Sequence, residues 1–177
     1  MKLNVPYYSQ KIDVKDPEWK DRACGITCLK MTLDFYGKDA PGLDELIELG
    51  VESGAYGKSG WIHQGLVDVA DKFGLTIESR EFKSDGESEL LREEGIRQII
   101  KSLKEGAPVL VSVVKQFKYT DKFHMVILVG TQGDEKTPEG FYYHDPDAHT
   151  TEEGKNLFVS IEMFRKHWRR MAIFIHR

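Results

Sequence analysis

The fold is decided by a short stretch near the N-terminus, which reads Ala23-Cys24-Gly25-Ile26-Thr27-Cys28-Leu29-Lys30-Met31. It opens a predicted helix over Cys24 to Tyr36, whose apolar residues cover most of the circumference and which Gly37 ends. A thiol at the start of a buried helix lies among unpaired backbone N–H groups at the positive end of the helix dipole, which lowers its pKa. Cys24 is therefore a candidate nucleophile. Cys28, one turn further on, is predicted to be a core residue.

Length and composition limit the class of protein. The 177 residues suffice for one core, and we expect a single domain over residues 1–177. The net charge is −4 and acidic and basic residues are interspersed, so the charge pattern does not indicate binding to nucleic acid. No run approaches the roughly 18 apolar residues of a membrane span and no secretory signal is seen, so a cytoplasmic location is expected. Both cysteines are predicted to be reduced, because two thiols four residues apart on one helix make a strained disulfide. The oligomeric state is not indicated.

The hydrophobic period changes along the chain. The first half predicts helices over residues 44–52, from a cap at Ser59 to Gly74, and from about Ser88 to Gly106, with one strand over residues 75–78. After Pro108 the pattern predicts strands over residues 109–114, 123–130, 140–144 and 171–176, with a short helix from Ser160 to Trp168. Helices followed by an antiparallel sheet indicate an α+β fold, with a site between the two parts.

Two of the predicted strands carry a histidine and an aspartate. Residues 131–139 contain glycine, aspartate and proline, so they are predicted to be the loop of a hairpin. If Gly130 pairs with Phe141, Val126 faces Asp145, and His124 lies two residues along the same face, within side-chain reach. A shift of one residue in the register would place them on opposite faces.

These side chains suit nucleophilic catalysis. The thiolate of Cys24 would attack a carbonyl, the imidazolium of His124 would protonate the leaving group, and the carboxylate of Asp145 would orient the ring. The resulting oxyanion needs preorganised donors, typically a backbone N–H and a side-chain amide. Gln10, fourteen residues before Cys24, is the upstream amide that fits this role if the loop between them folds back.

In order and spacing, these residues resemble the C39-like cysteine peptidases of the papain-like superfamily. The resemblance rests on segments spread over the whole chain: Val5-Pro6-Tyr7-Tyr8-Ser9-Gln10, Ala23-Cys24-Gly25, Glu105-Gly106-Ala107-Pro108-Val109, His124 to Gly130, and Asp145-Pro146. It implies a papain-like fold with Cys24 as nucleophile, His124 as base, Asp145 as orienting carboxylate and Gln10 in the oxyanion hole. It also implies a peptide or protein substrate. Ile26 stands where the family often has proline, a position that holds no catalytic atom.

Other functions remain open for the same constellation of residues. The acyl group could pass to an amine or a thiol instead of water, or the fold could serve as a peptide-binding module without turnover. Members of the family that are fused to export transporters cut a leader after a double glycine, and leader cleavage is one substrate class among several.

Three further motifs have plainer interpretations. His144, Asp145, Asp147 and His149 match no standard ligand spacing, so a solvated turn is favoured over a metal site. The segment Gly57-Lys58-Ser59 lacks the first glycine of a phosphate-binding loop, so no nucleotide or other cofactor is predicted. The glycine-rich segment around Trp61 is either a wall or lid of a cleft or a plain connection.

Overall fold

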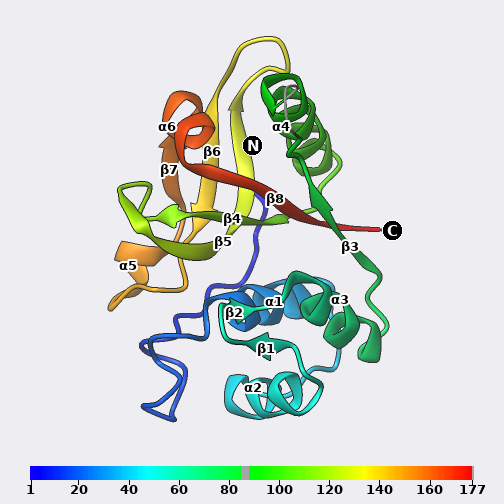
Figure 1. The fold of residues 1–177 in the computed structure, drawn as a ribbon, viewed down its shortest axis with the longest axis vertical. Coiled ribbons are helices and arrows are strands. Elements are labelled where there is room, and N and C mark those ends of the chain that lie inside the picture. The colour runs from blue at the N-terminus through cyan, green and yellow to red at the C-terminus, as the bar shows by residue number, and fades with distance from the viewer. Residues whose placement is uncertain (85–87, 177) are drawn as a thin grey trace.

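The computed structural model describes residues 1–84 and 88–176, whose helices and strands form two parts (Figure 1). In chain order the elements are α1 (Cys24–Phe35), α2 (Leu43–Glu52), β1 (Tyr56–Gly57), β2 (Gly60–Trp61), α3 (His63–Lys72), β3 (Ile77–Glu81), α4 (Ser88–Lys104), β4 (Val109–Lys115), β5 (Tyr119–Gly133), β6 (Pro138–His144), α5 (Thr151–Gly154), β7 (Leu157–Ser160), α6 (Ile161–His167) and β8 (Trp168–Ile175). Helices α1 to α3 lie on one side of the molecule, and the sheet with α4 and α6 lies on the other. The predicted α+β class is confirmed.

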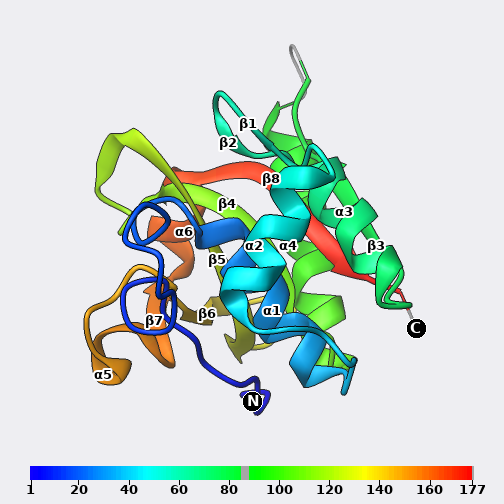
Figure 2. The same ribbon diagram turned by 90° about the horizontal axis from the view of Figure 1, so that it is seen from below.

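The main sheet is antiparallel and has the strand order β3-β8-β4-β5-β6-β7. Successive residues of its central strands pack on opposite faces. On β5, Met125, Ile127 and Val129 join the core formed with α1 to α3, whereas Val126 and Leu128 join the core beneath α4 and α6. Figure 2, seen from below, shows α1 to α3 in front of the sheet. Because both faces are covered, the central strands read as continuous apolar runs rather than as alternating ones.

Helix α1 is buried from Gly25 to Leu33 and packs against β5. Its first turn is fixed by Trp61, which lies against two glycines. A Cβ added at Gly25 would lie 2.8 Å from the Cβ of Trp61, and one at Gly50 would lie 2.7 Å from its ring. The indole N–H also donates a hydrogen bond to the carbonyl of Arg22 at 2.8 Å. The start of the helix, and with it Cys24, is therefore held in one position.

The predicted helices and strands are largely confirmed, and the differences fall at their ends. Ser59 does not cap a helix, because it lies in the turn of the small β1–β2 hairpin, and α3 begins at His63. Ser160 does cap α6, where its side chain accepts a hydrogen bond from the N–H of Met163. The structure adds β7 and α5, which the sequence pattern does not predict. Within the described residues, no helix combines the length and the apolar character that crossing a membrane requires.

Candidate active site

Strands β5 and β6 form the predicted hairpin, with one irregularity. Near the loop, the predicted pairing of Gly130 with Phe141 is wrong by one residue, because Gly130 pairs with Tyr142. A bulge at position 129 absorbs the difference, and beyond it Ile127 pairs with His144, which is the predicted register. The histidine and the aspartate are thereby brought to the same end of the hairpin.

The structure brings Cys24, His124 and Asp145 together. Nε2 of His124 lies 2.6 Å from Oδ1 of Asp145, and both side chains are buried. Because the carboxylate occupies Nε2, the other ring nitrogen, Nδ1, is left for the thiol of Cys24, which is hydrogen-bonded to the ring. The first residue of α1, which is partly buried, thus meets the buried ring of His124 on the facing strand β5, and this ring meets the buried carboxylate of Asp145.

The electrostatics of this chain favour a thiolate beside an imidazolium. Burial alone opposes a charge on Cys24, but hydrogen bonding to His124, its charge, and the backbone N–H groups of Met125 and Gly25 outweigh this and lower the pKa of the thiol. Burial likewise opposes a charge on His124, yet the hydrogen bonds to Asp145 and Cys24 prevail and raise the pKa of the ring. Each partner therefore stabilises the charged form of the other.

Asp145 is held by its backbone as well as by its carboxylate. The hydroxyl of Tyr7 donates to its carbonyl at 2.9 Å, and its own N–H donates to the carbonyl of Gly154 at 2.8 Å. The N–H of Asp147 donates to Oδ1 at 2.8 Å. A Cβ added at Gly154 would collide with the hydroxyl of Tyr7, so only glycine fits there. Sequence reasoning assigned no role to Gly154, because its contact with Tyr7 arises only in the folded chain.

Gln10 is buried beside this turn, and its amide is engaged by a carboxylate. Nε2 of Gln10 donates to Oδ1 of Asp147 at 2.8 Å, while Oε1 is buried and has no hydrogen-bond partner among the described residues. Asp147 also pairs with Lys11 and Lys115. Burial opposes its charge, but the hydrogen bond and charge of Lys115 prevail and lower the pKa of Asp147. Among the contacts of the described residues, none joins the Gln10 amide to the thiol of Cys24.

The polar turn after β6 is packed rather than solvated. His144 is 1% exposed; its Nε2 donates to the carbonyl of Val5 at 3.1 Å, and its Nδ1 accepts from the N–H of Asn156 at 3.0 Å. The side chain of Asp147 is also buried, and His149 is exposed. The expectation of a solvated turn is therefore wrong for residues 144 to 147. The N-terminal segment covers this turn, and His144 is a structural residue with both ring nitrogens bonded.

A pocket of about 200 Å³ opens over Cys24 and His124. Its walls come from the loop before α1, the β1–β2 hairpin, the start of α3, and strands β4, β5 and β8. The structure thus places Trp61 in the wall of this pocket. Three further lining residues, His63, Phe123 and Arg169, have no signal in the sequence, because they come from separate elements and carry no local motif.

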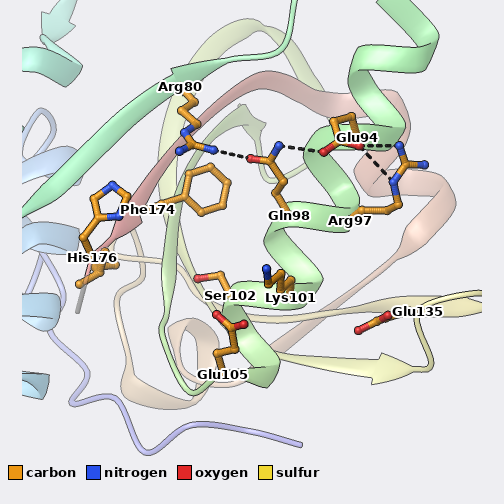
Figure 3. Close-up of a pocket in the computed structure, with 11 residues that line it drawn as sticks. Arg80, Glu94, Arg97, Gln98, Lys101, Ser102, Glu105, Glu135, Phe174 and His176 are labelled. Atoms are coloured by element: carbon orange, nitrogen blue, oxygen red, sulfur yellow. Dashed lines mark hydrogen bonds and ion pairs between the residues drawn. The ribbon is translucent and has the colours of Figure 1, made fainter.

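A larger pocket of about 590 Å³ lies between α4, β3 and the end of β8 (Figure 3). Its charged and amide side chains bond to one another: Oε1 of Gln98 accepts from Arg80 at 2.8 Å, its Nε2 donates to Glu94 at 2.9 Å, and Arg97 pairs with Glu94. Among the described residues that line it there is no cysteine. The cysteine and the histidine of the candidate site therefore line the smaller pocket, not the larger one.

An α+β fold in which a helix that begins with a thiol faces a sheet with a His–Asp pair is the architecture of the papain-like cysteine peptidases. The sequence matches the Peptidase_C39 like family over residues 2–173, and the protein belongs to this family. Membership of this family supports peptidase activity, that is, the hydrolysis of peptide bonds. No curated protein matches the sequence at a significant level.

Several solved structures share the fold. A protein from Bacillus anthracis described as a C39-like peptidase has 21% identity and a TM-score of 0.68, with 100% of this chain and 98% of that chain covered. A double glycine motif protease from an AMS/PCAT transporter, solved with the leader peptide, has 18% identity and a TM-score of 0.61, with coverage of 99% and 94%. The peptidase domain of Streptococcus ComA, a bi-functional ABC transporter, has 24% identity and a TM-score of 0.57, with coverage of 98% and 96%. These likenesses establish the fold.

Proposed function

We propose that the protein is a cysteine peptidase that cleaves a peptide bond through an acyl-thioester on Cys24. The observation that carries the proposal is the chain of contacts from thiol to ring to carboxylate, with Nε2 of His124 at 2.6 Å from Oδ1 of Asp145. The pKa of Cys24 is lowered and the pKa of His124 is raised, as thiol catalysis requires. Membership of a peptidase family supports the same function.

The reaction follows from the placement of these groups. The thiolate of Cys24 attacks the carbonyl carbon of the scissile bond, and a C–S bond forms. The imidazolium of His124 gives its proton to the leaving nitrogen as the C–N bond breaks. Water then attacks the thioester, with the neutral ring as general base, and the acid is released as the C–S bond breaks. Asp145 fixes the ring orientation through both steps.

The oxyanion requires donors on the thiol side of the pocket. The backbone N–H of Cys24 is one, as expected at the start of α1, where the residue before the helix contributes no capping side chain. The amide of Gln10 is proposed as the other. One of its two hydrogens is engaged by Asp147, which leaves the second for the substrate. Asp147 is then a positioning residue that acts through Gln10.

A peptide is the proposed substrate. The pocket over Cys24 is lined by residues of the β1–β2 hairpin and by Phe123, a residue that is 62% exposed. One structural relative was solved with a leader peptide, and a leader-like segment is accordingly one class of peptide to test.

The test is proteolysis of a mixture of peptides derived from cellular proteins. Wild-type protein, Cys24→Ala and the matched control Cys28→Ala are incubated with the mixture, and new N-termini are identified by mass spectrometry. We expect cleavage by wild type and by Cys28→Ala, and a mass adduct on Cys24 in acid-quenched samples. Cleavage that persists in Cys24→Ala, or no cleavage by any form, would contradict the proposal.

Added amines separate a peptidase from an acyltransferase on the same site. Once a cleaved peptide is known, an amine acceptor is added at high concentration, and the products are identified by mass spectrometry. Free acid as the dominant product is the result expected for a peptidase. A dominant amide product would assign the protein to acyl transfer instead.

A further inference from the structure

Strand β8 carries a bulge next to the active-site pocket. Ser112 and Val113 are adjacent on β4, but their partners on β8 are Met171 and Trp168, so residues 169 and 170 are extra on β8. The residue at position 170 is an arginine with φ of 60°, a left-handed conformation that non-glycine residues rarely adopt. Bulges of this kind occur beside active sites, where they redirect a side chain.

The first bulge residue, Arg169, is one of the residues that line the pocket over Cys24. Its guanidinium stacks on the ring of Phe123, 3.2 Å from the centroid, and Nη1 donates to Oγ of Ser112 at 3.4 Å. Within residues 1–84 and 88–176, no carboxylate forms an ion pair with it. The guanidinium is thus held in one orientation by stacking, partly shielded from water, and its charge lacks a counterion in the described chain.

The other titratable groups that line the pocket are either paired with an opposite charge or neutral. Asp21 pairs with Lys11, and Arg22 pairs with Glu18. Burial, and then the charge of Arg169, lower the pKa of His63, so this ring is neutral at physiological pH. The charge of His124 is paired with Asp145, so the described lining presents one cation, Arg169, that no protein carboxylate neutralises.

We propose that Arg169 binds a carboxylate of the peptide substrate beside the scissile bond and gives the enzyme a preference for an acidic group there. The inference rests on the proposed peptidase function. A guanidinium presents parallel N–H donors that match a carboxylate, and stacking on Phe123 orients them before the substrate arrives. The carboxylate belongs to an acidic side chain or to the C-terminus of a short peptide. The left-handed backbone at position 170 is then strain stored at a functional site.

Two small reagents test the charge preference without a known substrate. Iodoacetate carries a carboxylate and iodoacetamide is its neutral isostere, and both alkylate Cys24. Both rate constants are measured by mass spectrometry, and the constant for iodoacetate is divided by that for iodoacetamide. A general change in thiol reactivity alters both constants equally and leaves this ratio unchanged. In Arg169→Gln we expect this ratio to fall by roughly fivefold, because one nearby cation is removed.

A charge series at the same position sharpens the result. The ratio should stay near the wild-type value in Arg169→Lys and fall further in Arg169→Glu than in Arg169→Gln. The matched control is Arg97→Gln, an exposed arginine of the larger pocket, which should keep the wild-type ratio. Circular dichroism confirms that each variant is folded. A ratio that is the same in wild type, Arg169→Gln and Arg169→Glu would overturn the proposal.

Protection by peptides identifies the source of the carboxylate. Pairs that differ as Glu and Gln, or as C-terminal acid and amide, compete with iodoacetamide for Cys24, which requires binding but no turnover. The acidic member of one pair should protect at lower concentration, and Arg169→Gln should abolish that difference. Equal protection by both members of every pair would overturn the proposal. Failure of the peptidase function would show separately, as the absence of Cys24-dependent cleavage in the peptide mixture.

Discussion

The first and second turns of α1 carry the same side chain in opposite surroundings. Cys24 lines the pocket of about 200 Å³ and is hydrogen-bonded to His124. Cys28 is fully buried, and its thiol donates to the carbonyl of Met125 at 3.6 Å. The pKa of Cys24 is lowered, whereas burial and then the neighbouring charge of Cys24 raise the pKa of Cys28 well above its ordinary value.

The comparison separates the effect of burial on the pKa of a thiol from the effects of the helix start and of His124. Burial disfavours the thiolate at both positions, so burial does not explain the difference. Only the first turn has free backbone N–H groups and a histidine that faces it from β5. The lowered pKa of Cys24 is therefore due to its neighbours, and each neighbour can be removed to test how much it contributes.

Removal of His124 should have the largest effect. In wild type the pKa of Cys24 is lowered, so at a given pH more of it is thiolate than in an ordinary cysteine, and the thiolate is lost as pH falls through that lowered value. In His124→Ala the hydrogen bond and the positive charge vanish, burial dominates, and the pKa rises. We expect iodoacetamide alkylation at about pH 6 to slow by roughly 10- to 100-fold, and peptide turnover to fall by roughly 10²- to 10⁴-fold.

The pH profile of the wild type reports on the same pair. The pKa of His124 is raised, so the imidazolium that protonates the leaving group is present at neutral pH and is lost as pH rises through the raised value. Turnover should therefore be bell-shaped, with an acid limb from Cys24 and an alkaline limb from His124. Cys28 serves as the internal control in the alkylation series. Unchanged alkylation of Cys24 in His124→Ala would remove the basis of the comparison.

Removal of the Gln10 amide should separate turnover from thiol reactivity. Loss of an oxyanion donor costs roughly 10²- to 10³-fold in kcat, so we expect a loss of this size in Gln10→Ala. Alkylation by iodoacetamide occurs at a saturated carbon and forms no oxyanion. The rate constant for Cys24 should thus change little, and the two assays diverge. A parallel loss in both assays would mean that Gln10 acts through the fold, by way of its contact with Asp147.

A methyl group at Gly154 should disturb the carboxylate end of the chain. The new Cβ would collide with Tyr7, whose hydroxyl holds the carbonyl of Asp145. We expect Gly154→Ala to lower the free energy of unfolding by about 1 to 3 kcal/mol in urea titrations, as overpacking does. It should also slow Cys24 alkylation, because the ring loses its oriented partner. Gly42→Ala, whose Cβ would meet nothing within 4 Å, is the matched control and should leave Cys24 alkylation unchanged. Because Gly42 is the N-cap of α2, this control should lower the free energy of unfolding by no more than about 1 kcal/mol.

The meeting of Cys24, His124 and Asp145 could be predicted because its signals are local. A thiol at a helix start, a hairpin loop and a strand period each depend on a few adjacent residues, so the amino-acid sequence is enough to bring these three side chains to one place. The one error in this region, the pairing of Gly130, arises from a bulge that the hydrophobic pattern does not encode.

The residues that sequence reasoning missed depend on long-range packing. His144 and Asp147 are buried because the N-terminal segment, more than a hundred residues earlier, packs on their turn. Arg169 reaches the pocket because of a bulge in β8, and its stacking partner Phe123 lies on another strand. Ser59 is of a residue type that often caps helices, but it lies in the turn of a hairpin. Contacts between residues this far apart in the chain cannot be recognised from the spacing of residues along a single sequence.

Replacement of Cys28 should have the smallest effect, and it tests the comparison from its other side. Cys28→Ala removes one buried sulfur and its bond to Met125, which should cost about 1 kcal/mol in the free energy of unfolding. Because the pKa of Cys28 is raised, the residue is a neutral thiol at physiological pH and exerts no charge on Cys24. The alkylation rate of Cys24 and its pH profile should therefore stay within about twofold of wild type, since the interactions that lower its pKa are intact. A larger change would show that the two turns of α1 are coupled, and the reactivity of Cys24 would then belong to the helix as a whole.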